Sequence, residues 1–304
     1  MQTTPYSDAP ATPAQVDRIA YGAVHLDVSD LDRALRFWRD IVGLQEVDSV
    51  PGSAMLGAGG RTLIVLHDGA TRPAGRGHAG LYHVAIHLPD AVEFARVLAR
   101  LARAGVPQSP TEHVFSQATY VRDPDGIMLE LTLETPERYG SIEVGPTRVV
   151  LYDRDGRSHE GTEPLDVAAA LAPLGDGPTD LPLPAGTFVG HVHLHVPDLV
   201  AAYGWYRDVV GFSEHALMTA IGMADLGAGG VFPHRIALNV WHGPQARQPE
   251  PGTAGLRVFE LQVPASAALA ALARRAGTSV EADGSATLVD PAGNRLVVAV
   301  AAPA

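Results

Sequence analysis

The chain contains no cysteine among its 304 residues. This absence excludes disulfides, thiolate metal sites, iron–sulfur clusters and cysteine nucleophiles together. Any metal site must therefore be built from His, Asp, Glu or water. The 13 histidines supply ample candidates for such a site.

Basic residues and long apolar runs are also scarce. Lys and Arg number 22 against 34 Asp and Glu, which gives a net charge of −12. An acidic surface repels nucleic acid and anionic lipid, so neither nucleic acid nor membrane is an expected partner. No run approaches the roughly 20 apolar residues of a membrane span, and the first residues lack a signal-peptide pattern. These features predict a soluble cytoplasmic protein.

The sequence repeats itself at an offset of 193 − 25 = 168 residues. Residues 23–31 resemble residues 191–199, and residues 38–44 resemble residues 206–212. The motif Leu-Gly-Ala-Gly-Gly also occurs twice, at 56–60 and at 226–230. The chain is therefore a tandem duplication.

A weaker repeat lies inside each half. Residues 80–88 alternate like a strand and precede a helical run, and residues 255–263 form the equivalent strand of the second half. The pattern predicts an α+β fold of four βαβββ modules. The predicted parts of the chain are a flexible segment (1–17), a first domain (18–136), a linker with many Gly and Pro residues (137–186) and a second domain (187–301).

Three residues of the first half have metal-ligand chemistry. His25 and His83 lie mid-strand at the first strands of their modules, and Glu130 lies mid-strand in the last strand of the second module. Two histidines and one carboxylate can hold Fe(II) or Mn(II) on one face and leave other positions open. A single strand histidine is more often structural, and Glu130 alternates with two leucines and is also compatible with a solvent-facing position.

The modules and these positions resemble the vicinal oxygen chelate superfamily, which includes glyoxalase I, bleomycin-resistance proteins and extradiol dioxygenases. Residues 113–130 resemble the extradiol signature, in which a His, a Tyr, an Asp-Pro-Asp-Gly turn and a ligand Glu follow in order. Residues 80–83, 190–195 and 234–241 resemble the catechol-2,3-dioxygenase-like subgroup with tandem modules. The resemblance implies two curved-sheet half-barrels.

The resemblance also implies roles for individual residues. His25, His83 and Glu130 would bind Fe(II), with Mn(II) as the alternative, and a catechol-like aromatic would chelate the metal and react with O₂. Tyr120 would hydrogen-bond a substrate oxygen. His113 would act as the acid/base, which suits an imidazole near neutral pH.

The second half departs from the pattern. Val258, Val297 and Thr287 replace the counterparts of His83, Glu130 and Tyr120, so this half cannot build the same site. His193 is retained there. If the modules pair across the halves, His193 replaces His25 as the third ligand.

Two other functions remain open from the sequence. A glyoxalase-like lyase or isomerase would need a fourth ligand, and the last strand of the first module, residues 62–67, offers only His67. A non-catalytic, bleomycin-resistance-like protein would use the same cavity to bind a small molecule. Zn(II) is compatible with the same ligands, and a homodimer is the default expectation for the assembly.

Overall fold

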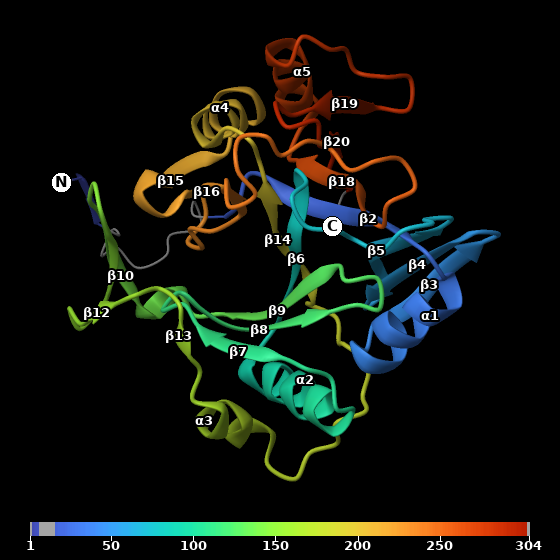
Figure 1. The fold of residues 1–304 in the computed structure, drawn as a ribbon, viewed down its shortest axis with the longest axis vertical. Coiled ribbons are helices and arrows are strands. Elements are labelled where there is room, and N and C mark those ends of the chain that lie inside the picture. Colours follow the sequence, from blue (N-terminus) through green and yellow to red (C-terminus); the bar gives the residue numbers. More distant parts are fainter. Residues whose placement is uncertain (1, 6–15, 303–304) are drawn as a thin grey trace.

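The computed structural model describes residues 2–5 and 16–302, and most of them belong to four successive modules (Figure 1). The first module comprises β2 (Ala20–Val28), α1 (Leu31–Leu35) with its π-helical continuation (Arg36–Ile41), β3 (Gln45–Val50), β4 (Ser53–Ala58) and β5 (Arg61–Asp68). The second comprises β6 (Gly80–Leu88), α2 (Ala91–Arg103), β7 (Ser109–Glu112), β8 (Ser116–Arg122) and β9 (Met128–Glu134).

The second half repeats this order with one strand fewer. The third module comprises β14 (Phe188–His195), α4 (Leu199–Trp205), β15 (Ser213–Met218), β16 (Met223–Gly227) and β17 (Ile236–Asn239). The fourth comprises β18 (Gly255–Val263), α5 (Ser266–Arg275), β19 (Ser285–Val289) and β20 (Arg295–Val300). The predicted α+β fold of strand–helix–strand modules is confirmed.

An aspartate begins the helix in three of the modules. The side chains of Asp30, Asp90 and Asp198 each accept a hydrogen bond from a backbone N–H in the first helical turn. Such a cap satisfies donors that the helix itself leaves free, so each strand ends and its helix begins at a defined residue. Within the described part of the chain, no helix has the length and apolarity needed to cross a bilayer.

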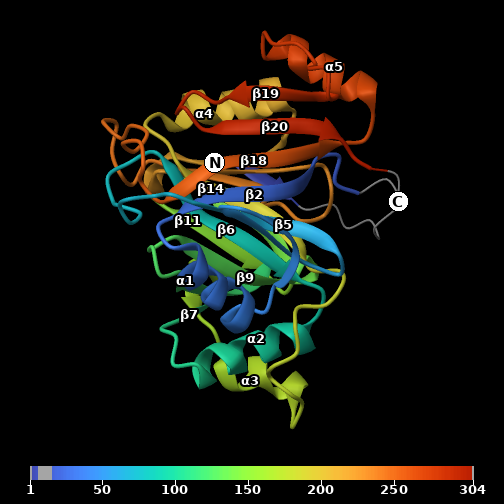
Figure 2. The same cartoon turned by 90° about the vertical axis from the view of Figure 1, so that its right-hand side faces the viewer.

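The modules pair across the two sequence halves. β6 of the second module lies antiparallel to β14 of the third, inside a nine-stranded sheet. β2 of the first module lies antiparallel to β18 of the fourth, inside a seven-stranded sheet. Figures 1 and 2 show these two central strand pairs packed against each other, with the helices outside them. Each curved sheet therefore combines one module from each half of the sequence.

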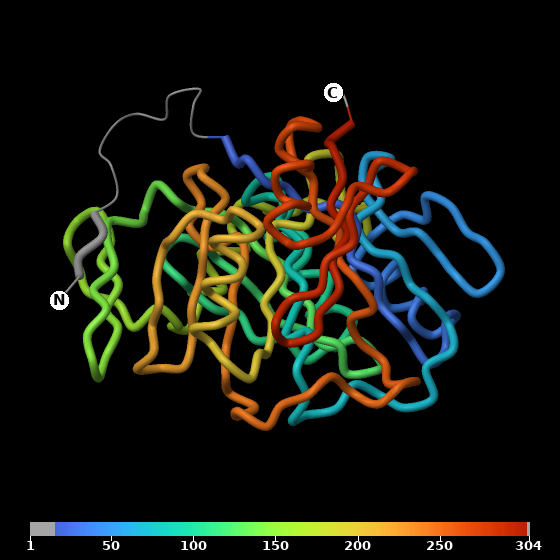
Figure 3. Tube along the Cα trace, turned by 90° about the horizontal axis from the view of Figure 1, so that it is seen from above, coloured from blue at the N-terminus to red at the C-terminus, as the bar shows by residue number. Residues whose placement is uncertain are grey.

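The linker carries strands of its own. β10 (Tyr139–Val144), β11 (Val149–Asp153) and β12 (Ser158–His159) form a sheet with β1 (Gln2–Pro5), and β13 (Glu163–Pro164) and α3 (Val167–Leu171) follow. Ile142 and Leu151 pack in a small core with Ala216 and Met218 of β15. Figure 3 shows this green segment at one end of the molecule, beside the third module. The predicted flexible segment 1–17 lies mostly outside the described residues.

A buried aspartate ties the turn between β8 and β9 to the first module. Asp123 accepts hydrogen bonds from the backbone N–H groups of Asp125 and Ile127 and from Trp38 Nε1. Burial raises the pKa of Asp123 to about 6. The folded protein therefore holds this proton more tightly than the unfolded chain, and the carboxyl lowers stability as the pH rises from about 4 to about 6.

Asp123→Asn should remove this pH dependence, because the amide does not titrate. Between pH 4 and pH 6.5 the free energy of unfolding should fall by on the order of 2 kcal/mol more in the wild type than in the variant. Urea unfolding at the two pH values measures this difference. Equal pH slopes for the two proteins would show that Asp123 titrates normally.

Candidate metal and substrate site

Three buried side chains from both sequence halves meet in the nine-stranded sheet. His83 lies on β6, Glu130 on the adjacent β9 and His191 on β14. Among the described residues, these three form the group whose donor atoms converge closely enough to hold one metal ion. Each side chain is at most 2% exposed, so bulk water has little access to the three donor atoms.

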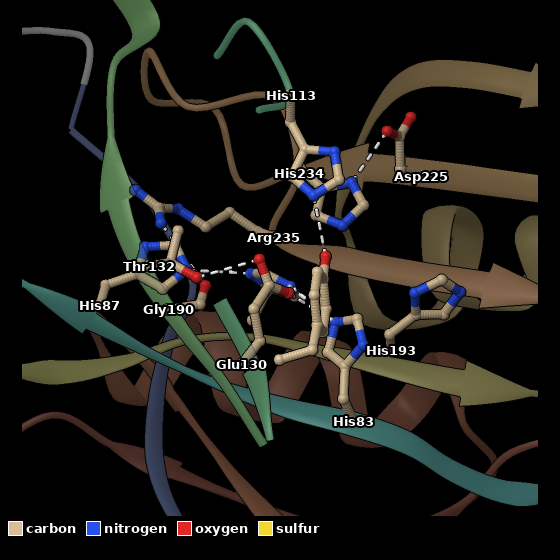
Figure 4. Close-up of polar contacts among 12 residues, drawn as sticks. His83, His87, His113, Glu130, Thr132, Gly190, His193, Asp225, His234 and Arg235 are labelled. Carbon is tan, nitrogen blue, oxygen red and sulfur yellow. Dashed lines mark hydrogen bonds and ion pairs between the residues drawn. The ribbon is translucent and has the colours of Figure 1, made fainter. Parts of the chain in front are cut away.

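The three donor atoms are mutually within hydrogen-bond distance. Glu130 Oε2 lies 2.9 Å from His83 Nε2 and 3.0 Å from His191 Nε2, and the two nitrogens are 3.0 Å apart. The other carboxylate oxygen of Glu130 accepts a hydrogen bond from Thr132 Oγ1 at 3.0 Å. This contact orients the carboxylate and leaves Oε2 facing the histidines (Figure 4).

Burial favours the protonation states that bind metal. It lowers the pKa of His83 and lowers that of His191 further, so both imidazoles are neutral. Burial alone would raise the pKa of Glu130, but the two facing imidazoles hold it well below its ordinary value. Two neutral imidazoles and one carboxylate are a donor set for a first-row divalent metal.

A chain of hydrogen bonds behind His191 fixes its tautomer. The Glu134 carboxylate accepts from His87 Nδ1 at 2.7 Å, and His87 Nε2 lies 2.9 Å from His191 Nδ1. His87 and Arg235 overcome the effect of burial and lower the pKa of Glu134 to about 2, so it is ionised and only accepts. His87 Nε2 therefore also accepts, and the donor is His191 Nδ1–H.

This tautomer leaves a lone pair on His191 Nε2. That lone pair points at the Glu130 oxygen 3.0 Å away, which also carries only lone pairs. A proton on His83 Nε2, which lies 2.9 Å from the Glu130 oxygen and 3.0 Å from His191 Nε2, offsets the repulsion of these two atoms, and a metal cation at the same place would offset it as well. His83 Nδ1 is buried without a hydrogen-bond partner among the described residues. The polar contacts of this ring are therefore those of Nε2 with Glu130 and His191. The residues fit a bound divalent metal.

Gly190 gives His87 the space to support His191. A Cβ at this position would collide with the His87 ring, and both residues are labelled in Figure 4. Gly190→Ala should displace His87, release His191 Nδ1 and weaken metal binding about 10–100-fold, as losses behind a ligand commonly do. Competition with a chelator measures the affinity. Gly204→Ala, where a Cβ meets no neighbour within 4 Å, is the control; an equal loss in both variants would contradict the role of His87.

The structure does not bring His25 to this group, which corrects the predicted ligand set. His25 lies on β2 in the other sheet, with Nε2 3.0 Å from Glu260 and Nδ1 3.0 Å from His67. The reason is the pairing of the modules, because β6 neighbours β14 and not β2. His25 and the chain it forms with His67 and Glu260 belong to the seven-stranded sheet.

His193, the alternative third ligand, lies near the site without joining the group. Its ring centroid is 5.0 Å from that of His83, but its Nε2 accepts a hydrogen bond from Asn239 Nδ2 at 2.9 Å. His191 is the residue that converges with His83 and Glu130. The alternation of residues 190–195 indicated that both histidines share a face, but could not say which one reaches Glu130.

His113 and Tyr120 lie together at the same cavity. His113 Nδ1 donates to the Gly161 carbonyl at 2.7 Å, so its Nε2 accepts from the Tyr120 hydroxyl at 2.9 Å. Tyr120 lies opposite Glu130 in the strand register, and its ring centroid is 5.5 Å from that of His83. Burial and the nearby Glu130 carboxylate raise the pKa of Tyr120 well above its ordinary value. The phenol is therefore protonated.

A histidine that the sequence did not single out as catalytic also faces the cavity. His234 donates from Nδ1 to Asp225 at 2.9 Å, and its ring centroid is 4.7 Å from that of His191 (Figure 4). Among the described residues, His234 Nε2 has no hydrogen-bond partner. Asp225 also binds His215 at 2.7 Å. Burial would raise the pKa of Asp225, but these two histidines hold it below its ordinary value.

These residues line one cavity of about 460 Å³. One wall is apolar and comes from the second module, the linker sheet and the third module, and it includes Phe115, Ile142, Val149, Leu151 and Met218. The volume is of the size that holds a small organic ligand. The linker strands thus complete a pocket whose polar side is the histidine–carboxylate group.

Comparison with known proteins places this arrangement in a family. The sequence profile of the glyoxalase/bleomycin resistance protein/dioxygenase superfamily matches residues 16–131. A catechol-2,3-dioxygenase from Bacillus subtilis (strain 168) is 32% identical over 266 residues, which cover 86% of this chain and 89% of that protein. The chain belongs to this superfamily.

A solved structure supports the fold of this superfamily over nearly the whole chain. Glyoxalase I from Zea mays superposes with a TM-score of 0.55 at 16% identity, and the match covers 93% of each chain. At this identity the likeness concerns the fold alone. The predicted fold class, with tandem modules of this superfamily, is confirmed.

The converging group offers three donor side chains, and the strand position related to that of Glu130 carries none. In the paired strands, Ala85 lies opposite Glu130, and His193 lies opposite Ala237. The approximate twofold relation of β6 to β14 makes Ala237 the counterpart of Glu130. An alanine cannot ligate a metal. His67, the residue considered as a fourth ligand, lies in the other sheet.

Proposed function

We propose that the protein is an extradiol dioxygenase that opens the ring of a catechol-like aromatic with O₂. The proposed metal is Fe(II), with Mn(II) as the alternative, held by His83, His191 and Glu130. The observation that carries the proposal is the open side of this donor set, since Ala237 stands where a second carboxylate would close it. Two histidines and one carboxylate with open positions are typical of non-haem Fe(II) oxygenases.

The metal, when bound, would supply a Lewis acid for the substrate oxygens and a redox partner for O₂. The chain's own residues would hold and orient the ring. Phe115, Ile142 and Leu151 line the apolar wall, which suits an aromatic face and excludes water.

Proton transfer is proposed for His113 and Tyr120. The Tyr120 hydroxyl donates to His113 Nε2, so its oxygen can accept a hydrogen bond from a substrate hydroxyl. A proton leaving the substrate can then pass by way of Tyr120 to His113, whose Nδ1–H remains bonded to the Gly161 carbonyl. His234 offers a second acid/base at the cavity, because Asp225 holds its Nδ1 and leaves Nε2 free.

Oxygen consumption by anaerobically Fe(II)-reconstituted protein tests the proposal. A panel of catechols should give one O₂ consumed per ring opened, with both atoms of ¹⁸O₂ in the product, and Glu130→Gln should consume none. A lyase would instead isomerise its substrate without O₂. Tight binding of aromatic ligands with no O₂ uptake from any catechol would favour the small-molecule-binding alternative and overturn the proposal.

A further inference from the structure

A second cavity adjoins the candidate active site. It has a volume of about 570 Å³ and shares Tyr82, Met128 and Trp241 with the cavity of the metal group. The Tyr82 ring lies between the two, with its centroid 5.0 Å from that of His83 and 5.3 Å from that of Trp241. We call this second cavity the outer recess.

The charge of the outer recess is opposite to that of the protein. Arg76 and Arg122 line it, and no Asp or Glu does so among the described residues. The protein as a whole has 34 acidic against 22 basic residues. His78, His195 and His242 also line the recess, and burial lowers the pKa of His195 to about 4. The two arginines supply the permanent positive charge of the recess.

Neither arginine is neutralised by a neighbour. Most arginines near the core of this protein have carboxylate partners, such as Arg235 with Asp17 and Glu134. Within residues 2–5 and 16–302, neither Arg76 nor Arg122 forms an ion pair. Arg122 donates from Nη1 to the Gly126 carbonyl at 2.8 Å, which holds the guanidinium at the recess and leaves its other N–H groups available.

The position of Arg122 links the recess to the metal site. It is the last residue of β8, the strand that carries Tyr120, and its positive charge acts on the Tyr82 hydroxyl. A ring bound beside His83 would therefore have its far edge near Tyr82, with the two guanidinium groups beyond it. A guanidinium recognises a carboxylate with two parallel hydrogen bonds.

From this arrangement we infer that the outer recess binds a carboxylate carried on a short side chain of the aromatic substrate. The inference rests on the proposed ring-opening function for the place of the ring, and it adds the substrate class. The preferred substrate is then an aromatic acid with adjacent ring hydroxyls, and an uncharged catechol of the same size binds more weakly.

Calorimetric binding without O₂ tests this inference on the metal-loaded protein. The ligands are 3,4-dihydroxyphenylacetate and its uncharged primary amide. The wild type should bind the acid about tenfold or more tightly than the amide, because a charged hydrogen bond is lost with the amide. The preference should shrink at high salt, since the recess is open to solvent.

Two variants separate the recess from general charge effects. Arg122→Met should reduce the preference for the acid to within about twofold. Arg103→Met, which removes an exposed arginine of α2 outside both cavities, should retain the full preference. Equal affinity for acid and amide in the wild type, or an equal effect of the two variants, would overturn the inference.

The binding measurement does not depend on turnover. Preferential binding of the acid without any O₂ uptake would support the recess and contradict the ring-opening function. Ring opening with equal affinity for acid and amide would support the function and contradict the recess.

Discussion

His191→Ala should lose its metal and its ring-opening activity together. The imidazole lies 3.0 Å from both Glu130 and His83, so its removal leaves two donors, which hold a divalent ion weakly. Turnover under metal-limited conditions should fall by about a thousandfold or more, because both the Lewis acid and the position of the substrate are lost. Elemental analysis of protein purified without O₂ measures the metal per chain.

His25→Ala is the matched control for this variant. His25 is also a histidine in the first strand of a module, but it bonds Glu260 and His67 in the seven-stranded sheet. The variant should keep about one metal per chain and most of its activity. Loss of metal in His25→Ala with retention in His191→Ala would contradict the ligand assignment.

His234→Ala and His113→Ala should each keep the metal and lose most of the turnover. Neither residue belongs to the converging donor group, but both line the cavity and can exchange a proton there. A positioned acid/base commonly contributes about 10²–10⁴ to the rate, so each kcat should fall by a factor in this range.

Single-turnover and steady-state rates at several pH values measure this effect. His159→Ala is the control, because His159 pairs with Asp153 and Glu163 in the linker and lines neither cavity. An unchanged kcat in both His113→Ala and His234→Ala would show that the substrate exchanges its protons with another group. Loss of metal in either variant would instead mean that the substituted histidine is a metal ligand.

The repeat and its modules could be predicted because they depend on local pattern. Alternating strands, helical runs and capping aspartates recur along the chain, and each is formed by residues near in sequence. The pairing of modules could not be predicted in the same way. It joins strands such as β6 and β14 that are about a hundred residues apart, and two tandem arrangements satisfy the same local pattern.

The same distinction separates the site residues. His113, Tyr120 and Glu130 lie within one continuous signature, and the structure brings them to one cavity. The identity of the third donor could not be predicted, because it depends on which strand lies beside β6. A shift of two residues along β14 exchanges His191 for His193 on the same face, and alternation does not resolve such a shift. For His234, the sequence signal was its place at the start of residues 234–241, which resemble the catechol-2,3-dioxygenase-like subgroup.

Anomalous diffraction from crystals of the metal-loaded protein, collected at the absorption edge of the bound metal, locates the metal directly. We expect one strong peak per chain between His83 Nε2, His191 Nε2 and Glu130 Oε2, on the side of the cavity that Phe115 and His234 line. A peak at His25, His67 and Glu260 instead, or no peak after reconstitution with Fe(II) and Mn(II), would contradict this ligand assignment.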